Sequence, residues 1–209
     1  MAKIVITIAR QYGSGGREIG ERVSQILNIK QYDSELITLS SQKSNISEEI
    51  LKTADEKATN SLLYTLAMGS NMYGLSHHFG YNMPINDRLF ATQSGLIREI
   101  ADRESCIIIG RCGDYILRNY ENVIRIFIYA PIEDRKKRVA KRHPELKPSD
   151  VISLINKTDK RRSSYYNFYT GNRWGKYDNY DYAINSSCLG IDGTAEMIAD
   201  IARMKNKNK

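Results

Sequence analysis

A glycine-rich segment near the start of the chain has the residue types that bind phosphate. It reads RQYGSGGREIG at residues 10–20. Glycines let several backbone N–H groups converge on an anion, and the positive end of a following helix adds attraction. Against the usual pattern, G-x-x-x-x-G-K-[ST], Gly16 takes the place of the second glycine and Arg17 that of the lysine. Gln11 stands where the first glycine should be, and Glu18 where a hydroxyl would help to hold Mg²⁺. The segment is a degenerate phosphate loop, and similar turns also join strands to helices without binding a ligand.

The residues on either side of this segment predict the elements that would position it. The β-branched run IVITIA at residues 4–9 is typical of a strand buried on both faces. After the turn, apolar residues recur at helical spacing, as one face of an amphipathic helix requires: Ile19, Val23, Ile26 and Leu27. Arg10 and Arg17 bracket the turn. The order of strand, glycine turn and helix favours a phosphate site.

Further strands are predicted at residues 31–33, 106–109, 123–130 and 180–185. Apolar strands separated by helices are typical of a parallel sheet that is covered on both faces. Ligands of such sheets bind beyond the carboxyl ends of the strands. We therefore expect the glycine turn, Asp33, Arg111 and the segment after Ala130 to surround one crevice.

Helices are predicted at residues 34–57, 87–104, 131–142, 148–166 and 194–204. Two of them, 131–142 and 148–166, are rich in Lys and Arg and are joined by a proline-bounded loop. They could form a lid over a polyphosphate, and the plain alternative is a solvated basic face. Four arginines are expected to face the mouth of the crevice: Arg135, Arg138, Arg161 and Arg162. The aromatic residues between 165 and 182 could stack on a nucleobase, but packing is the commoner fate of such residues.

Composition bounds the class of protein. The chain has 209 residues, 41% of them hydrophobic, which is enough for one domain with a small appended lobe. A net charge of +7 favours acidic partners such as nucleotides. The sequence contains no helix-turn-helix, zinc-finger or RNP motif, so we expect no specific nucleic-acid binding. It also contains no apolar run long enough to cross a membrane, so no membrane partner is expected.

The metal-binding residue types predict no metal site. The three cysteines are Cys106, Cys112 and Cys188. They lack paired spacing, and the neighbours His77 and His78 would not point at one ion. An odd number of cysteines without a secretory signal indicates the cytoplasm. Residues 60–84, which are rich in Met and Tyr, fit a mobile lobe, a lid or the contact of a homodimer.

Four segments, in this order and spacing, resemble the cytidylate kinase-like family, relatives of the cytidylate kinases among the phosphate-loop nucleoside monophosphate kinases. They are residues 10–19, 32–37, 108–117, and 159–162 together with 181–187. The resemblance implies an α/β fold of three layers, in which helices flank a central five-stranded parallel sheet. It also implies one P-loop kinase-like domain over residues 1–209, with an acceptor-binding helical lobe at 34–90 and a lid at 131–180.

The resemblance further implies transfer of the γ-phosphoryl group of ATP, with Mg²⁺, to a nucleoside monophosphate or a similar small phosphorylated acceptor. The donor would be bound by Gly13, Ser14, Gly15, Gly16, Arg17 and Glu18. Asp33 and Arg111 would bind the acceptor, with Arg111 on its phosphate. The expected catalytic residues are Arg17, Arg111, Arg161 and Arg162, of which the last two would close from the lid onto the transition state.

This sequence departs from true cytidylate kinases beside the Gly-Arg pair and in the loop. Ile109 and Cys112 stand where those enzymes carry Asp, and Glu18 lacks the hydroxyl for Mg²⁺. Three functions therefore compete. The first is an ATP-dependent small-molecule kinase, and the second is a non-catalytic nucleotide-binding regulatory protein with a degenerate phosphate loop. The third, suggested only by the basic charge and the aromatic residues, is a protein associated with nucleic acid.

Overall fold

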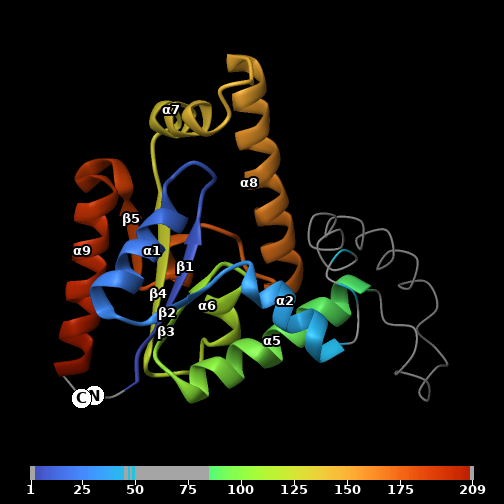
Figure 1. The fold of residues 1–209 in the computed structure, drawn as a ribbon, viewed down its shortest axis with the longest axis vertical. Helices are drawn as coiled ribbons and strands as arrows, with labels where there is room; N and C mark the ends of the chain where they lie inside the picture. The colour runs from blue at the N-terminus through green and yellow to red at the C-terminus, as the bar shows by residue number, and fades with distance from the viewer. Residues whose placement is uncertain (1–2, 45–46, 48, 50–84, 208–209) are drawn as a thin grey trace. The chain divides into compact units, whose positions relative to one another are not determined.

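The computed structural model describes residues 3–44, 47, 49 and 85–207. Its centre is a parallel sheet of five strands (Figure 1). The strands are β1 (Val5–Arg10), β2 (Lys30–Tyr32), β3 (Cys106–Ile109), β4 (Val123–Tyr129) and β5 (Tyr182–Asn185). They lie in the order β2-β3-β1-β4-β5, with helices on both faces of the sheet. The α/β fold expected from the sequence is confirmed.

Strand β1 is paired on both sides, which explains its unbroken apolar sequence. Ile6 lies opposite Ile107 of β3 and Ile124 of β4. All three side chains are fully buried in the main hydrophobic core. Because β1 is central, its carboxyl end delivers the glycine-rich turn to the middle of one edge of the sheet.

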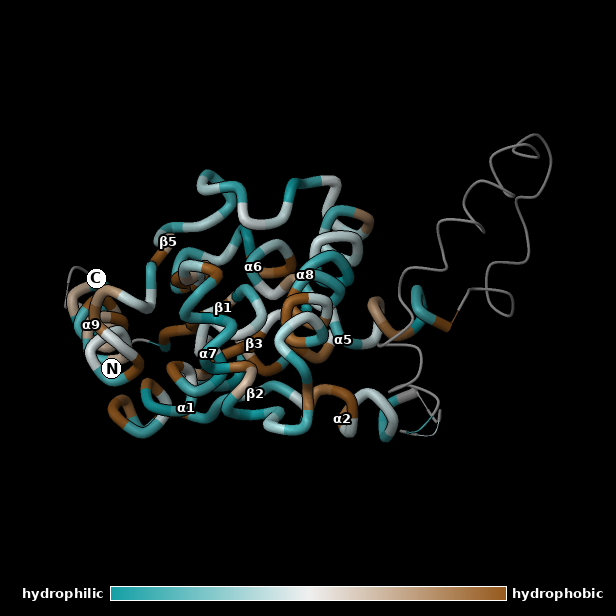
Figure 2. Tube along the Cα trace, turned by 90° about the horizontal axis from the view of Figure 1, so that it is seen from above, coloured by the Kyte–Doolittle hydropathy of each residue, from teal (hydrophilic) through white to brown (hydrophobic). Residues whose placement is uncertain are grey.

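Helices α1 (Gly16–Leu27) and α9 (Ser186–Lys207) cover one face of the sheet and pack against each other. Ile19 and Val23 of α1 and Ile198 of α9 enter the core that the strands form. In Figure 2 the strand segments and the inner sides of these helices are largely hydrophobic, whereas the outer loops are hydrophilic. This packing fixes the first turn of α1 beside the end of β1.

The opposite face is covered by α6 (Gly113–Ile116) and by residues that follow α8 (Pro148–Thr170). Phe127 of β4 packs against Trp174 and Tyr180, with ring centroids 5.3 and 5.1 Å apart. The Tyr166 hydroxyl of α8 donates a buried hydrogen bond of 2.6 Å to Asp114 of α6. These aromatic residues are packed, as the sequence favoured. A 3-10 helix, η2 (Tyr177–Asn179), precedes β5.

Helices α7 (Ile132–Arg142) and α8 pack against each other beyond the carboxyl end of the sheet, with α7 lying across the view of Figure 1 and α8 running along it. Val139 of α7 and Val151 and Ile155 of α8 form a small apolar core, against which Tyr12 of the glycine-rich turn packs. The two basic helices are thus attached to the turn by an apolar contact as well as by charge.

The chain divides into two compact units, one of residues 1–33 and 97–209 and the other of residues 34–96. The described helices of the second unit are α2 (Glu35–Ser44) and the first part of α5 (Ile85–Arg103), which crosses the boundary. The role of residues 34–90 as an acceptor-binding lobe stays a prediction. Most of the helix expected at 34–57 and the whole Met- and Tyr-rich segment at 60–84 lie outside the described residues.

Several element boundaries differ from expectation. Helix α9 begins at Ser186, before the expected 194, because its first turns are joined to the rest across a kink at Gly190, where φ is 69° and ψ is −173°. Helix α8 continues to Thr170 and ends at Gly171 in the left-handed conformation, as is common at helix C-termini. Helix α6 was not expected, because it is only four residues long. In the part of the chain that the structure describes, no helix is long and apolar enough to cross a membrane.

Candidate functional site: a phosphate loop beside four arginines

The turn after β1 is anchored at its start by Gln11, which stands where the usual pattern has glycine. The Gln11 amide donates to the Ile128 carbonyl at 3.0 Å, and its side-chain Oε1 accepts from the Ala130 amide at 3.3 Å. Both partners lie at the end of β4. The side chain of Gln11 therefore ties the turn to the neighbouring strand.

Gly13 and Gly15 give the turn its shape. Both are in the left-handed region, with φ of 79° and 82°. A Cβ at Gly13 would lie 2.9 Å from the Arg135 carbonyl, and a Cβ at Gly15 would collide with Ile191. Ser14 lies between them, and its carbonyl accepts a buried hydrogen bond of 2.6 Å from Ser186 of α9. The loop is thus supported by contacts from α7 and α9.

Helix α1 begins directly after this turn, with Gly15 as its N-cap residue. The amides of Gly16, Arg17 and Glu18 belong to the first turn and so have no acceptor within the helix. They lie at the positive end of the helix dipole. Together with the glycine turn, they form a site for an anion of the size of a phosphate group.

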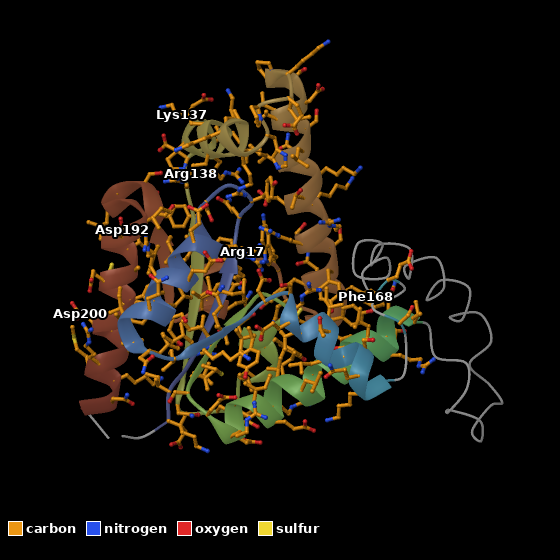
Figure 3. All side chains as sticks on the ribbon, viewed as in Figure 1. Arg17, Lys137, Arg138, Phe168, Asp192 and Asp200 are labelled. Atoms are coloured by element: carbon orange, nitrogen blue, oxygen red, sulfur yellow. The ribbon has the colours of Figure 1, made fainter. Side chains whose placement is uncertain are left out.

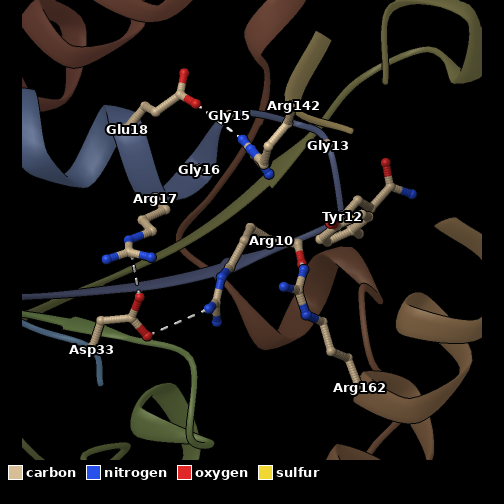
Figure 4. A pocket seen from close by; sticks show the side chains of 11 residues that line it. Arg10, Tyr12, Gly13, Gly15, Gly16, Arg17, Glu18, Asp33, Arg142 and Arg162 are labelled. Carbon is tan, nitrogen blue, oxygen red and sulfur yellow. Dashed lines mark hydrogen bonds and ion pairs between the residues drawn. The ribbon is translucent and has the colours of Figure 1, made fainter. Parts of the chain in front are cut away.

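A cleft of about 300 Å³ lies over this loop (Figure 4). Its lining is Arg10, Gln11, Tyr12, Gly13, Gly15, Gly16, Arg17, Glu18, Asp33, Arg142 and Arg162. The lining contains four arginines and two carboxylates, and it comes from the ends of β1 and β2 and from α1, α7 and α8. Figure 3 shows Arg17 on the side of α1 that faces α8, whereas Asp192 and Asp200 lie on the outer side of α9. The cleft suits a ligand with several negative charges.

Arg10 is the most enclosed of these cations. Its side chain passes between Gly16 and Gly110, because a Cβ at Gly16 would lie 2.6 Å from the Arg10 Cβ and one at Gly110 would collide with the Arg10 guanidinium. The pKa of Arg10 is lowered to about 9, mainly by burial and then by the positive charge of Arg162. A bound anion would relieve this repulsion.

Asp33 is the carboxylate that holds two of the arginines together. Its Oδ1 lies 3.7 Å from Nη2 of Arg10, and its Oδ2 lies 3.4 Å from Nε of Arg17. Arg17 also contacts Glu21 of its own helix at 3.3 Å. Asp33 therefore orients Arg10 and Arg17 toward the cleft, as the dashed lines in Figure 4 show.

Arg111 lies close to this cluster but outside the lining of the cleft. It follows Gly110 in the left-handed region, with a φ of 54°. Burial lowers the pKa of Arg111, while the charges of Tyr165 and Asp33 act in the opposite direction. Arg111 and the cleft thus share Asp33 as an electrostatic neighbour.

Helix α8 meets the phosphate loop through Asp159 and Arg162. Asp159 accepts the Tyr12 amide at 2.7 Å and forms an ion pair of 2.5 Å with Arg135 of α7. Arg162 donates to the Arg10 carbonyl at 2.9 Å and stacks over the Tyr12 ring at 5.6 Å. The two basic helices are therefore joined directly to the loop that they face.

The structure brings together most of the residues that the sequence singled out. All the expected donor-site residues except Ser14 line one cleft together with Asp33 and Arg162. Ser14 is buried, and its hydroxyl donates to the Gln11 carbonyl at 2.9 Å. Arg135 instead lies buried beneath the loop, where it also donates to the Tyr12 carbonyl at 3.3 Å, and Arg138 donates to the Gly13 carbonyl at 3.4 Å. Arg161 is exposed outside the cleft lining, and its charge acts on Arg111. The catalytic and binding roles of these residues stay predictions.

The amino-acid sequence was compared with those of known protein families. The profile of the cytidylate kinase-like family matches residues 5–188. The chain belongs to this family. No curated protein matches the sequence.

Three solved structures extend the comparison. An uncharacterized protein from Eubacterium ventriosum is similar with a TM-score of 0.70 and 24% identity, over 96% of this chain and 99% of that chain. A shikimate kinase from Bacteroides thetaiotaomicron has a TM-score of 0.54 and 11% identity, over 96% and 98%. A gluconokinase from Sinorhizobium meliloti has a TM-score of 0.50 and 12% identity, over 99% and 97%. At these identities the likeness shows the fold, which this member of the cytidylate kinase-like family shares with P-loop kinases.

The sequence alone does not assign a role in this site to three residues: Arg10, Arg142 and Asp159. In the sequence Arg10 only brackets the turn, although its position directly after an apolar strand is a signal that it faces the crevice. Arg142 belongs to a run of cations that reads as a solvated face. Asp159 is a lone carboxylate among cations, and its contact with the Tyr12 amide follows only from the tertiary structure.

The site fits a polyphosphate but offers no evident place for a protein-held Mg²⁺ among the residues that line the cleft. Both carboxylates of the lining already face arginines, since Asp33 is paired as described and Glu18 lies 3.0 Å from Arg142. Among the residues that the structure describes, no three His, Cys, Asp or Glu side chains group as metal ligands. Arginine side chains cannot ligate a metal ion, because they carry no lone pair for it.

Proposed function

We propose that this member of the cytidylate kinase-like family is a phosphotransferase that moves the γ-phosphoryl group of ATP to a small phosphorylated acceptor, with a nucleoside monophosphate as the first candidate. The observation that supports it is the gathering of loop amides and four arginines around one cleft at the carboxyl edge of the sheet. Family membership and the kinase fold support a P-loop kinase. The donor, the acceptor and the residue roles are part of the proposal.

In this proposal the loop residues hold the donor. The amides from Gly13 to Glu18 bind the phosphates, and Arg17 takes the place of the loop lysine. Its planar fork can make two parallel hydrogen bonds to phosphate oxygens, which a compact ammonium group cannot do. Asp33 keeps Arg17 on the cleft side of α1 through their contact of 3.4 Å.

The acceptor would bind on the side of Asp33 where Arg111 lies. Arg111 would bind the acceptor phosphate, and Arg161 and Arg162 would stabilise charge on the group in transfer. In such a reaction the protein need not form a covalent bond to the transferred group, because positioning and charge neutralisation account for most of the rate enhancement. The lid would consist of residues 131–180, which include α7 and α8.

The test is a coupled assay of ATP consumption with a panel of nucleoside monophosphates and non-nucleotide phosphate esters. We expect turnover with at least one acceptor. Arg17→Gln should weaken ATP binding by about tenfold or more, since a charge-assisted hydrogen bond contributes about 1.5–3 kcal/mol. Arg111→Gln should raise the KM of the acceptor and leave ATP affinity nearly unchanged.

A matched control is Arg22→Gln. Arg22 also lies on α1, but it pairs with Asp192 at 3.1 Å outside the cleft lining. This variant should change the ATP dissociation constant and the KM of the acceptor by no more than about twofold relative to the wild type, as surface substitutions usually do. Binding of ATP by the wild-type protein without transfer to any acceptor would contradict the kinase proposal.

That contrary outcome would favour the second candidate, a non-catalytic nucleotide-binding regulatory protein. The observation behind it is the pairing of Glu18 with Arg142, at the loop position where the usual pattern places a hydroxyl for Mg²⁺. The two candidates predict the same nucleotide affinity, and turnover alone separates them.

A further inference from the structure

The ion pair between Glu18 and Arg142 lies at the position where P-loop proteins use a different pair of groups. Glu18 occupies the loop position of the Ser or Thr whose hydroxyl helps to hold Mg²⁺. Its Oε1 lies 3.0 Å from Nη2 of Arg142, and both residues line the cleft (Figure 4). A carboxylate that holds a guanidinium thus stands where a hydroxyl would hold a metal ion.

The two helices that carry this pair place it beside the loop. Glu18 is in the first turn of α1, and Arg142 is in the last turn of α7. Helix α7 is held on the loop by the hydrogen bonds of Arg135 and Arg138 to the carbonyls of Tyr12 and Gly13. Arg142 is therefore positioned at the cleft by a helix that is hydrogen-bonded to the loop.

The pair leaves most of the guanidinium available to a ligand. The structure shows one hydrogen bond from Arg142 to Glu18, and a guanidinium has five N–H donors. The side chains of Arg142 and Glu18 are 45% and 50% exposed, so their pairing adds little net stability. Phosphate oxygens can therefore engage Arg142 without the loss of a strong internal interaction.

We propose that Arg142, positioned by Glu18, supplies at the donor phosphates the positive charge that a hydroxyl-bound Mg²⁺ supplies in other P-loop proteins, so that nucleotide binding needs no divalent cation. This inference rests on the proposed function, because it concerns the same cleft. It assigns a phosphate-binding role to Arg142 and a positioning role to Glu18. It concerns binding alone, and a metal ion that arrives with the nucleotide can still take part in transfer.

The charges of the cleft agree with this assignment. Arg10, Arg17, Arg142 and Arg162 face only Asp33 and Glu18 among the residues that line it. The lining is therefore cationic before any metal ion is added. A nucleoside triphosphate without Mg²⁺ carries more negative charge than its magnesium complex, so such a cleft should bind the metal-free form at least as well.

The experiment is titration calorimetry of the full chain with ATP, once in excess Mg²⁺ and once in EDTA. For the wild-type protein we expect dissociation constants that agree within about threefold. For Arg142→Gln we expect a loss of about tenfold or more in EDTA and a smaller loss in Mg²⁺, since the metal ion can replace the missing cation. A merely structural role of Arg142 would lower the affinity equally in both buffers.

Two further variants sharpen the test. In the double variant Glu18→Ser, Arg142→Gln, the loop regains its hydroxyl, and ATP binding should become at least about tenfold stronger in Mg²⁺ than in EDTA. Arg22→Gln breaks an exposed ion pair between α1 and α9, outside the cleft lining, and should leave both affinities unchanged. Far-UV circular dichroism and a thermal melt verify that each variant is folded.

The outcomes separate this inference from the proposed function. Wild-type binding in Mg²⁺ but not in EDTA would overturn the role of Arg142 and leave the kinase proposal standing. Equal losses of ATP affinity for Arg142→Gln in the two buffers would also overturn the role of Arg142 and leave the kinase proposal standing. Absence of ATP binding in both buffers would overturn the proposed function, and this inference with it.

Discussion

The guanidinium of Arg10 lies directly over the Cα of Gly110, so closely that a Cβ at residue 110 would collide with its Nη1. Arg10 is the last residue of β1 and Gly110 directly follows β3, and these two strands are paired in the sheet. Gly110 also has a φ of 71°, which side chains other than glycine rarely adopt. One glycine thus provides both the turn after β3 and the space for a cation of the cleft.

Gly110→Ala should therefore have two effects. Backbone strain should lower the free energy of unfolding by about 1–2 kcal/mol. The displaced Arg10 should in addition weaken ATP binding. Gly171→Ala is the matched control, because Gly171 has a φ of 70° but a methyl group there would meet no atom of the described residues within 4 Å. Urea denaturation should show a similar destabilisation in both variants, and calorimetry a loss of affinity in Gly110→Ala only. Equal ATP affinities of the Gly110→Ala and Gly171→Ala variants would mean that the position of Arg10 does not depend on Gly110.

Arg10 itself should oppose folding while it supports binding. Its guanidinium is enclosed beside other cations, and its pKa is lowered to about 9, mainly by burial. Arg10→Met keeps much of the volume and removes the charge. We expect an unfolding free energy that is unchanged or higher by about 1 kcal/mol, as for other buried charges that are replaced by apolar groups. ATP affinity should fall by about tenfold or more.

Urea denaturation and calorimetry measure these two quantities. The control is Arg98→Met, because Arg98 is an exposed arginine of α5, outside the cleft lining. It should change the unfolding free energy by less than about 0.5 kcal/mol. A loss of several kcal/mol in Arg10→Met would show instead that the contact of Arg10 with Asp33 supports the fold.

Asp159 should be the main link between helices α7 and α8 and the phosphate loop. It accepts the Tyr12 amide and pairs with Arg135, whose side chain is only 10% exposed. Asp159→Ala leaves a buried cation without its partner, so we expect a loss of about 3 kcal/mol in unfolding free energy. Asp159→Asn should lose less unfolding free energy, because its side-chain amide oxygen can still accept the hydrogen bond from the Tyr12 backbone N–H.

The same denaturation experiment provides the control. Asp134 also forms an ion pair on α7, but with Lys137 at 3.7 Å, where the lysine is 79% exposed. Asp134→Ala should change stability by less than about 0.5 kcal/mol. Similar effects of Asp134→Ala and Asp159→Ala would show that α7 and α8 are not anchored to the loop through Asp159.

The sheet and the loop could be predicted because their signals are local. The strand at 4–9, the glycines after it and the helix that follows are encoded within about thirty residues, and the parallel arrangement follows from apolar strands separated by helices. The expected convergence of the glycine turn and Asp33 at one crevice needed only the rule that ligands bind at the carboxyl ends of such strands. The structure places both at one cleft.

Contacts between distant surface residues could not be predicted in this way. Arg142 and Glu18 are 124 positions apart, and nothing in the run of cations around Arg142 distinguishes it from its solvated neighbours. Arg135 lies in the same run, yet it is buried under the loop. Helical spacing shows which face of a helix is apolar, but not which other element its polar face meets.

Asp114 is a buried carboxyl group that the proposed reaction does not use. It is 4% exposed in α6, three residues after Arg111, and it accepts the hydroxyl of Tyr166 at 2.6 Å. Its pKa is raised to about 6, chiefly by burial, and the hydrogen bond from Tyr166 opposes this shift. The contact joins the end of α8 to the segment that carries Arg111.

This shift predicts a specific dependence of stability on pH. Because the pKa of Asp114 is higher in the folded protein than its ordinary value of 3.8, the folded state holds the proton more tightly. The contribution of Asp114 to stability is therefore full below about pH 4 and is lost as the pH rises toward 6, by about 2–3 kcal/mol. Relative to the wild type, Asp114→Asn should gain stability as the pH is raised from 4 to 7, and Tyr166→Phe should move the upper end of this interval to higher pH. Urea denaturation at each pH measures both effects. If the unfolding free energies of the wild type and Asp114→Asn changed in parallel with pH, the assignment of this pH dependence to Asp114 would be refuted.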